Sequence, residues 1–459
     1  MNVASVKIEN ASFVITVDPD RRIVADASIL IEGDRIARVA KADDLRDASA
    51  DRVIDASDMV VTPGFVNGHM HISYAHATRG IFPDDLGPEY LPNVFGLQSV
   101  MTEEEERLTS LLALTELLKH GTTTLLDPGS TKHIEACMAA YKDSGCRIIT
   151  GRHVTDRPNP LNVPVYPTAE AIEITRRTIE DMDGRLSGRM RAWAMPFSPE
   201  YASDELLLAC RRLADERDTG LTLHFNVGGA TAEKYMSRYG VTPTRRLADL
   251  GVLGPNVTLA HGLGISRDDV DVVAVTGARV VMCPTAAVKG GAGMASTALL
   301  PEMLEAGVDV GLGTDAGNNS NLVETMRSMY LAAVLYKDGR RDVTQVPAET
   351  AVELATLRGA RALGLGDEIG SVEEGKRADL VLFDTRRAEW RTLFNPVNNL
   401  VYNADGRSVH TVIVDGRVVV EDHVPAFVDE WELIQQVQRI GEDMLARTGV
   451  RFPSRWPIG

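Results

Sequence analysis

Residues 60–71 read VVTPGFVNGHMH, an apolar run that ends in two histidines one residue apart. In a β-strand, side chains two residues apart project from the same face, so the imidazoles of His69 and His71 are placed to bind one metal ion. The pair alone is weak evidence, because with 10 histidines in the chain such a spacing arises easily by chance. The interpretation therefore depends on the residues at the ends of the other strands.

The middle of the chain, residues 60–364, repeats this strand-and-loop pattern eight times. The apolar segments are GFVNGH, GTTTLLDPG, CRIITGRH, MRAWAMPFSP, GLTLHFNV, NVTLAHG, ARVVMCPTA and VDVGLGTDAG, and helical patterns lie between them. Apolar strands that alternate with amphipathic helices indicate a parallel sheet, and eight such units in about 300 residues fit a (β/α)8 TIM barrel. A doubly wound open sheet is the competing fold, but no G-x-G-x-x-G follows the first strand.

The two ends of the chain have a different pattern, with short alternating strands broken at Gly and Asp. The segments IEGDRIARV and VDGRVVVED share the same hairpin turn chemistry although they lie near opposite termini. We predict that residues 1–59 and 365–425 form one composite β-sandwich domain, and that residues 426–459 form a helical tail. Two separate β extensions are the alternative.

Composition limits the class of protein. Of 459 residues, 44% are hydrophobic and 25% are charged, which is typical of globular proteins in solution. The net charge of −17 argues against nucleic acid or an anionic membrane as a partner. The four cysteines show no C-x-x-C spacing, and the first residues lack a secretory signal pattern. We expect a cytoplasmic protein that acts on a small molecule.

Polar side chains follow four of the eight predicted strands. His69 and His71 end the first strand, His224 the fifth, His261 the sixth and Asp315 the eighth. The carboxyl ends of barrel strands meet at one rim, which is where catalytic groups gather in this architecture. Each residue alone has a structural explanation, but five metal-binding or basic side chains at matching positions predict a metal centre.

Taken in order, VVTPGFVNGHMH, GTTTLLD, LAHG, MCPTA, VGLGTDAG and EIGSVEEGKRADLVLFD resemble the amidohydrolase superfamily over essentially the whole chain. Within it the chain is similar to the chlorohydrolase and aminohydrolase branch, which includes triazine-degrading enzymes and adenosine-, guanine- and cytosine-type deaminases. The resemblance implies that His69, His71, His224 and Asp315 bind one divalent metal ion. Zinc is expected, and iron, cobalt or manganese would also suit these ligands. A homo-oligomer is expected from the same resemblance.

The resemblance also implies the chemistry. The metal ion would lower the pKa of its water, Asp315 would accept the water's proton and pass it to the leaving group, and His261 would orient the water or stabilise the oxyanion. Relatives with two metal ions use a carboxylated lysine at the end of the fourth strand. That strand, RMRAWAMPFSP, ends without a lysine, so one metal ion is expected.

One position departs from the pattern of the deaminases. They typically carry a glutamate three residues after the fifth-strand histidine, where it serves a ring nitrogen of the substrate. Here Val227 occupies that position, and Glu233 lies six residues further on. Either Glu233 or another group takes over, or the substrate has no ring nitrogen to protonate.

The second option favours hydrolysis of an open-chain urea, carbamate or amide, as in phenylurea- and molinate-type hydrolases. An aminohydrolase, deaminase or dechlorinating hydrolase of a triazine, purine or pyrimidine is the alternative. A catalytically silent scaffold is disfavoured because every ligand position is retained.

Several further residues are expected near the substrate. Those that end or follow the strands are Trp193, Phe197, Tyr201, Val227 and Asn318. The aromatic rings would pack on an apolar substrate, and the Asn318 amide would orient a polar group. His76 and His153 are weaker candidates for the pocket wall.

Overall fold

The computed structural model describes residues 5–451 and 454–456, apart from residues 74, 75, 84, 130 and 162. Eight parallel strands form the centre of the molecule, and each lies within one of the eight predicted segments. Their order is β6 (Phe65–Asn67), β7 (Thr122–Leu126), β8 (Arg147–Thr150), β10 (Met190–Ala192), β12 (Leu221–Phe225), β13 (Val257–His261), β14 (Arg279–Met282) and β15 (Val310–Leu312). Short strands β9 (His153–Val154) and β11 (Met195–Pro196) extend β8 and β10.

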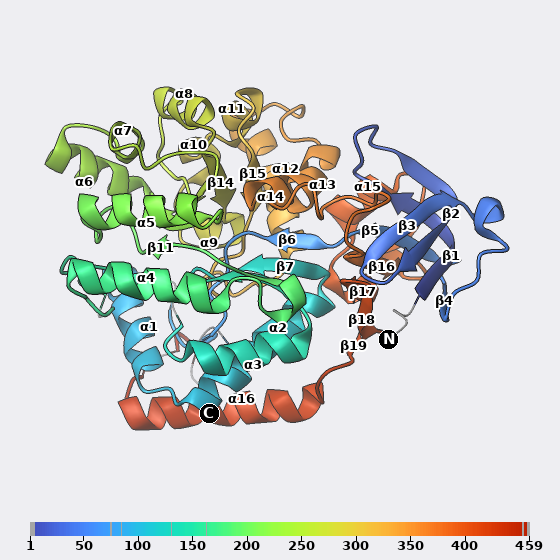
Figure 1. Cartoon of the computed structure of the whole chain (residues 1–459), viewed down its shortest axis with the longest axis horizontal. Coiled ribbons are helices and arrows are strands. Elements are labelled where there is room, and N and C mark those ends of the chain that lie inside the picture. Colours follow the sequence, from blue (N-terminus) through green and yellow to red (C-terminus); the bar gives the residue numbers. More distant parts are fainter. Residues whose placement is uncertain are drawn as a thin grey trace.

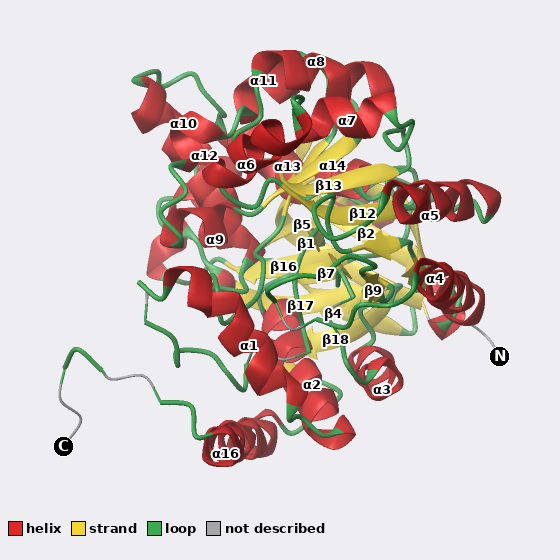
Figure 2. Cartoon of the chain, turned by 90° about the vertical axis from the view of Figure 1, so that its left-hand side faces the viewer, coloured by secondary structure: helices red, strands yellow, loops and turns green. Residues whose placement is uncertain are grey.

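Two contacts close these strands into a barrel. Ala194 pairs with Leu221 in a parallel bridge between the β10–β11 and β12 strands. On the other side, the Gly68 N–H donates to the Leu312 carbonyl at 2.8 Å, which joins β6 to β15. Figure 2 shows the yellow strands inside a layer of red helices. The predicted (β/α)8 barrel is therefore present, and the carboxyl ends of its strands share one rim.

Helices cover the barrel. They are α1 (Tyr90–Ser99), α2 (Glu103–Lys119), α3 (Ile134–Ser144), α4 (Thr168–Met182), α5 (Asp204–Glu216), α6 (Gly229–Tyr239), α7 (Pro243–Asp249), α8 (Arg267–Thr276), α9 (Pro284–Lys289), α10 (Met294–Thr297), α11 (Leu300–Glu305), α12 (Thr325–Arg340), α13 (Ala348–Ala355), α14 (Leu357–Ala362), α15 (Pro396–Asn398) and α16 (Glu430–Thr448). Side-chain caps fix the starts of two of these helices: Thr102 and Glu105 form a capping box at α2, and Ser203 caps α5.

Strands from both ends of the chain form one nine-stranded sheet beside the barrel (Figure 1). The N-terminal strands are β1 (Ser5–Ile15), β2 (Ile23–Glu32), β3 (Arg35–Lys41), β4 (Arg52–Asp55) and β5 (Met59–Pro63); the C-terminal strands are β16 (Leu380–Asp384), β17 (Val409–Val414), β18 (Arg417–Glu421) and β19 (Val424–Pro425). Antiparallel pairing of β16 with β5 joins the two sets, and β5 leads directly into the barrel through Gly64. The strands of the two termini thus pair in one sheet, as expected. That this sheet forms a two-layered sandwich, and that the domain ends at the predicted residues, stay predictions.

A buried ion cluster fixes the sheet against the barrel. Arg147, the first residue of β8, contacts Asp379 at 2.9 Å and Asp415 at 2.9 Å. All three side chains are buried. Because the charges are paired and hydrogen-bonded, their burial is tolerated, and loss of one partner would leave an uncompensated charge.

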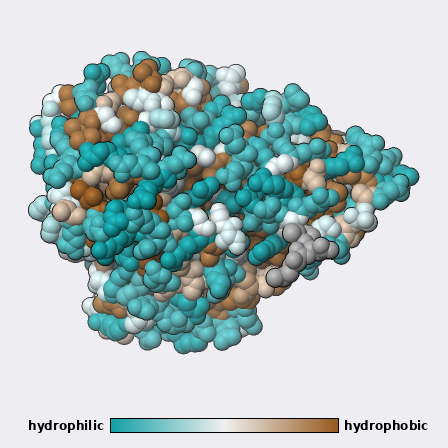
Figure 3. Space-filling view, in the orientation of Figure 1, coloured by the Kyte–Doolittle hydropathy of each residue, from teal (hydrophilic) through white to brown (hydrophobic). Residues whose placement is uncertain are grey.

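The end of the chain returns along the barrel. Helix α16 packs on α2, and Lys119 pairs with Glu430 at 2.7 Å (Figure 1). Residues 452, 453 and 457–459 of the predicted tail lie outside the described residues. The face in Figure 3 is largely hydrophilic, with only scattered apolar patches. Across the part of the chain that is described, no helix is both long and apolar enough to cross a membrane.

Candidate metal centre

The barrel brings five predicted residues together at the carboxyl ends of its strands. They are His69, His71, His224, His261 and Asp315, hereafter the His/Asp cluster. All five are buried, with 0–8% of each residue exposed. His69 and His71 follow β6, His224 lies in β12, His261 ends β13 and Asp315 follows β15. Strand ends far apart in sequence therefore supply one site, as the sequence predicts.

Distances within the cluster are those of metal ligands around a common centre. Ring nitrogens of His69, His224 and His261 lie within 4.8 Å of one another, and His69, His71 and Asp315 form a second such group. His71 Nε2 lies 3.6 Å from Asp315 Oδ1 and 3.1 Å from His224 Nε2. A single ion can therefore be reached by side chains from four strands.

The hydrogen bonding of the cluster fits a bound cation. Both ring nitrogens of His69 are buried, and neither has a hydrogen-bond partner among the described residues. His224 Nδ1 lies 3.1 Å from the Phe197 carbonyl oxygen. Because a carbonyl oxygen can only accept a hydrogen bond, Nδ1 must be the donor. The proton of neutral His224 therefore sits on Nδ1, and its Nε2 lone pair faces His71. A buried ring nitrogen without a partner, as in His69, is costly, and a bound cation would satisfy its lone pair.

The protonation states also suit metal binding. Burial and the neighbouring imidazoles hold the pKa of His69 and His71 well below the usual 6.5, and lower the pKa of His224 to about 4. Burial alone would raise the pKa of Asp315, but the facing His261 and His69 lower it. At neutral pH the site thus presents neutral imidazoles and a carboxylate, the forms in which these groups bind metal ions.

Two neighbours fix the Asp315 carboxylate. The Ala316 N–H donates to Oδ1 at 2.7 Å, and Asn319 Nδ2 donates to Oδ2 at 2.9 Å. Asp315 also has a positive φ of 61°, an uncommon conformation that turns its side chain away from the course of the strand. The carboxylate is therefore held in one orientation toward the histidines.

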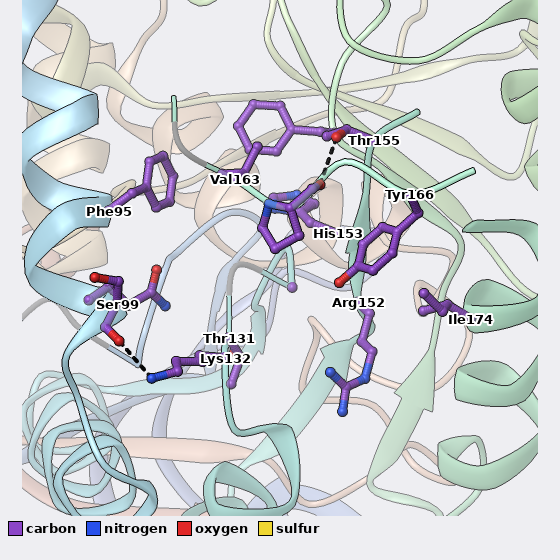
Figure 4. A pocket seen from close by; sticks show the side chains of 14 residues that line it. Phe95, Ser99, Thr131, Lys132, Arg152, His153, Thr155, Val163, Tyr166 and Ile174 are labelled. Carbon is purple, nitrogen blue, oxygen red and sulfur yellow. Dashed lines mark hydrogen bonds between the residues drawn. The ribbon is translucent and has the colours of Figure 1, made fainter. Parts of the chain in front are cut away.

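A cavity of about 180 Å³, the inner cavity, opens on the cluster. It is lined by His71, Tyr90, Leu91, Val94, Phe95, Phe197, His224, Val227, His261, Asp315, Ala316, Asn318 and Asn319. A second cavity of about 320 Å³, the outer cavity, shares Phe95 and Phe197 with it. Figure 4 shows the outer cavity, with His153 between the rings of Phe95 and Tyr166. The inner cavity gives a small molecule access to the cluster, and most of its remaining wall is apolar.

The structure places three of the five expected substrate contacts, Phe197, Val227 and Asn318, in the inner cavity wall. Tyr201 packs against the Phe197 ring, 6.0 Å away between centroids, but lines neither cavity. Trp193 is not brought to the site. It belongs to a buried apolar cluster with Val66 and Leu363 and lines a separate cavity beside Gly220, so its expected contact with the substrate has no support.

The two weaker histidine candidates differ. His153 lines the outer cavity, with its ring centroid 5.0 Å from that of His224. His76 instead pairs with Glu116 at 2.7 Å and lies outside both cavities. Sequence reasoning missed Tyr90 and Phe95, because the loop after β6 and the start of α1 carry no periodic pattern or motif.

Comparison with known proteins identifies the family of the chain. Residues 60–419 match the model of the amidohydrolase family. The chain is 32% identical to a 5-methylthioadenosine/S-adenosylhomocysteine deaminase of Syntrophobacter fumaroxidans over 93% of this chain and 95% of that protein. It is 31% identical to a 5'-deoxyadenosine deaminase of Methanosarcina mazei over 97% and 99% of the two chains.

Two solved structures share the fold closely. An adenosine deaminase from Xanthomonas campestris with bound zinc superposes with a TM-score of 0.87 at 26% identity, over 96% of this chain and 98% of that one. An atrazine chlorohydrolase from Arthrobacter aurescens complexed with zinc gives 0.87 at 26% identity, over 95% and 100%. Fold and sequence agree, and this chain belongs to the amidohydrolase family.

Proposed function

We propose that this protein is a metal-dependent aminohydrolase that replaces an amino group of an N-heterocycle by oxygen and releases ammonia. The observation that carries the proposal is the buried His/Asp cluster at the base of the inner cavity. The names of the relatives support the leaving group and make a 5'-modified adenosine the first substrate to test. They favour this reaction over the open-chain ureas and carbamates expected from the sequence.

The ion would be held by His69, His71, His224 and Asp315. A divalent ion such as zinc supplies hydroxide at neutral pH by lowering the pKa of its water. Asp315 is the only acidic side chain among the described residues that line the inner cavity. In the proposed reaction it takes the proton of the attacking water and delivers it to the departing amine, while His261 orients the water. A cytoplasmic location and a homo-oligomeric state belong to the same proposal.

One observation supports a second candidate, the hydrolysis of an open-chain urea, carbamate or amide. Val227 lines the inner cavity where a carboxylate would serve a ring nitrogen. Glu233 does not replace it, because it is exposed on α6 and lies outside both cavities. Direct attack on a carbonyl carbon needs no such carboxylate.

Product analysis separates the two candidates. Zinc-loaded protein is incubated with 5'-methylthioadenosine, 5'-deoxyadenosine, aminated and chlorinated triazines, aryl ureas, carbamates and anilides, and the products are identified by mass spectrometry. Ammonia and an oxo-heterocycle support the aminohydrolase. A substituted amine from an open-chain substrate, with no reaction of the heterocycles, overturns it in favour of the second candidate.

The metal assignment has its own test. Purified wild-type protein should contain one zinc ion per chain by elemental analysis. His69→Ala should lose the ion, whereas His410→Ala, on β17 outside the cluster, should retain it. A wild-type protein that takes up no divalent ion would overturn the metal-dependent reaction itself.

A further inference from the structure

The inner cavity has a polar edge that lies outside the His/Asp cluster. Tyr90, at the start of α1, donates its hydroxyl proton to Asn318 Oδ1 at 3.1 Å. Asn318 Nδ2 in turn donates to Thr78 Oγ1 at 2.9 Å. Tyr90 and Asn318 line the cavity, while Thr78 is fully buried behind them. The chain of contacts ties the loop after β6 to the loop after β15.

Few other polar side chains border the inner cavity. Outside the cluster, its described lining residues with polar side-chain atoms are Tyr90, Asn318 and Asn319. The amide nitrogen of Asn319 is engaged by Asp315. The rest of the wall is apolar, with Phe95, Phe197 and Val227 among it. Apart from the His/Asp cluster and the Asn319 carbonyl, Tyr90 and Asn318 are therefore the polar side chains that the described cavity wall offers to a substrate, and a polar group left without a partner costs free energy.

Counting donors and acceptors gives the direction of the contact. A tyrosine hydroxyl has one proton to donate and lone pairs that accept. The proton of Tyr90 is used by Asn318, whose carbonyl is held in place because its amide nitrogen bonds Thr78. The phenol also stays protonated, since burial and the nearby Asp315 raise its pKa. What Tyr90 offers to the cavity is thus an acceptor oxygen.

We propose that Tyr90 is a substrate-contacting residue whose phenol oxygen accepts a hydrogen bond from an N–H of the leaving amino group. Asn318 and Thr78 are then positioning residues that fix the hydroxyl. The contact selects substrates whose departing nitrogen carries hydrogen over those in which it is fully alkylated. This inference rests on the proposed hydrolysis of a C–N bond at the cluster, and it applies to ammonia and to a substituted amine alike.

The test compares matched ligands in matched variants. Tyr90→Phe removes the hydroxyl and keeps the ring. Inhibition constants are measured for 5'-methylthioadenosine, which carries an amino group, and for its N,N-dimethyl form. Because binding is measured, the dimethyl form does not have to be turned over. In the wild type the amino form should bind more tightly. Tyr90→Phe should weaken only the amino form, by about tenfold, which is the loss of one neutral hydrogen bond.

Controls separate this role from a structural one. Tyr330→Phe, on α12 and outside both cavities, should change neither constant. Thr78→Val should act in the same direction as Tyr90→Phe but less strongly, because it frees the Asn318 amide and leaves the phenol in place. Melting temperature and zinc content are recorded for each variant. Equal weakening of both ligands by Tyr90→Phe, or weakening of neither, would overturn the proposal.

The result does not depend on which leaving group the protein releases. Product analysis of the wild type comes first and decides between ammonia and a substituted amine. If the product is a substituted amine, the same comparison is made with the N–H and N-methyl forms of the corresponding open-chain ligand. The identity of the products would thus show that the aminohydrolase proposal is wrong. The ratio of the two inhibition constants would show that the Tyr90 proposal is wrong.

Discussion

Metal-free protein should lose stability steeply as the pH falls from 7 to 4, and His224 should cause a large part of the loss. This residue is buried, and burial first, then His261, lowers its pKa from 6.5 to about 4. In the unfolded chain the imidazole titrates near its ordinary value, so between these two pH values the unfolded state binds the extra proton. The stabilisation is therefore fully present above pH 6.5 and is lost progressively down to pH 4.

The size of the effect follows from the same two pKa values. Each pH unit between them corresponds to 1.36 kcal/mol, so His224 alone accounts for about 3 kcal/mol of unfolding free energy. That is a substantial part of the 5–15 kcal/mol typical of folded domains. Bound zinc competes with the protons, so the loss in zinc-loaded protein should begin at lower pH.

Urea unfolding of chelator-treated protein at several pH values between 7 and 4 measures this loss. His224→Gln keeps an amide N–H that can donate to the Phe197 carbonyl but cannot titrate. Between pH 7 and pH 4 the unfolding free energy of this variant should therefore fall by about 3 kcal/mol less than that of the wild type. His410→Gln, on β17, should follow the wild type. Identical pH dependence in the wild type and His224→Gln would refute the assignment to His224, because the other buried histidines and the carboxylates would then explain the whole loss.

Three further perturbations test separate parts of the structure. Asn319→Ala removes the bond to Asp315 Oδ2 and should lower zinc affinity or activity about 10- to 100-fold, measured by competition with a chelator, while Asn321→Ala should not. Arg147→Met leaves the buried Asp379 without its cationic partner and should cost about 3–5 kcal/mol in urea unfolding; adding Asp379→Leu to Arg147→Met should reduce that cost. Val227→Glu, at a residue 46% exposed, should change stability by less than about 0.5 kcal/mol and should raise activity on amino-heterocycles relative to open-chain substrates. An unchanged activity ratio would show that a carboxylate at this position does not act on a ring nitrogen.

The barrel and the His/Asp cluster were predictable because their signals are local. A strand is recognised by a few consecutive apolar residues, and its last side chains necessarily reach the shared rim. His224 and Asp315 could therefore be assigned to one site although 90 residues separate them along the chain. No knowledge of loop conformation was needed.

The substrate contacts were less predictable because they depend on irregular backbone. The fourth strand is interrupted between Ala192 and Met195, which breaks the regular alternation at Trp193, and this residue lines a cavity that contains none of the His/Asp cluster. Tyr90 reaches the inner cavity from a long loop whose path no periodicity defines. Glu233 is carried away from the site because α6 begins at Gly229 and leaves it on an exposed face.

The relatives and the inner cavity bear on different properties of this protein. An identity of about 30% over nearly the whole chain shows the family and its fold, and one fold can support reactions with different leaving groups. The choice of leaving group depends on the few side chains around the substrate, and Val227 lines the inner cavity at the position where the resemblance to deaminases predicts a glutamate. The Tyr90 oxygen accepts an N–H from either kind of amine and so does not resolve the choice. The ratio of activity on amino-heterocycles to activity on open-chain substrates, compared between the wild type and Val227→Glu, therefore tests the reaction more directly than any further similarity to deaminases.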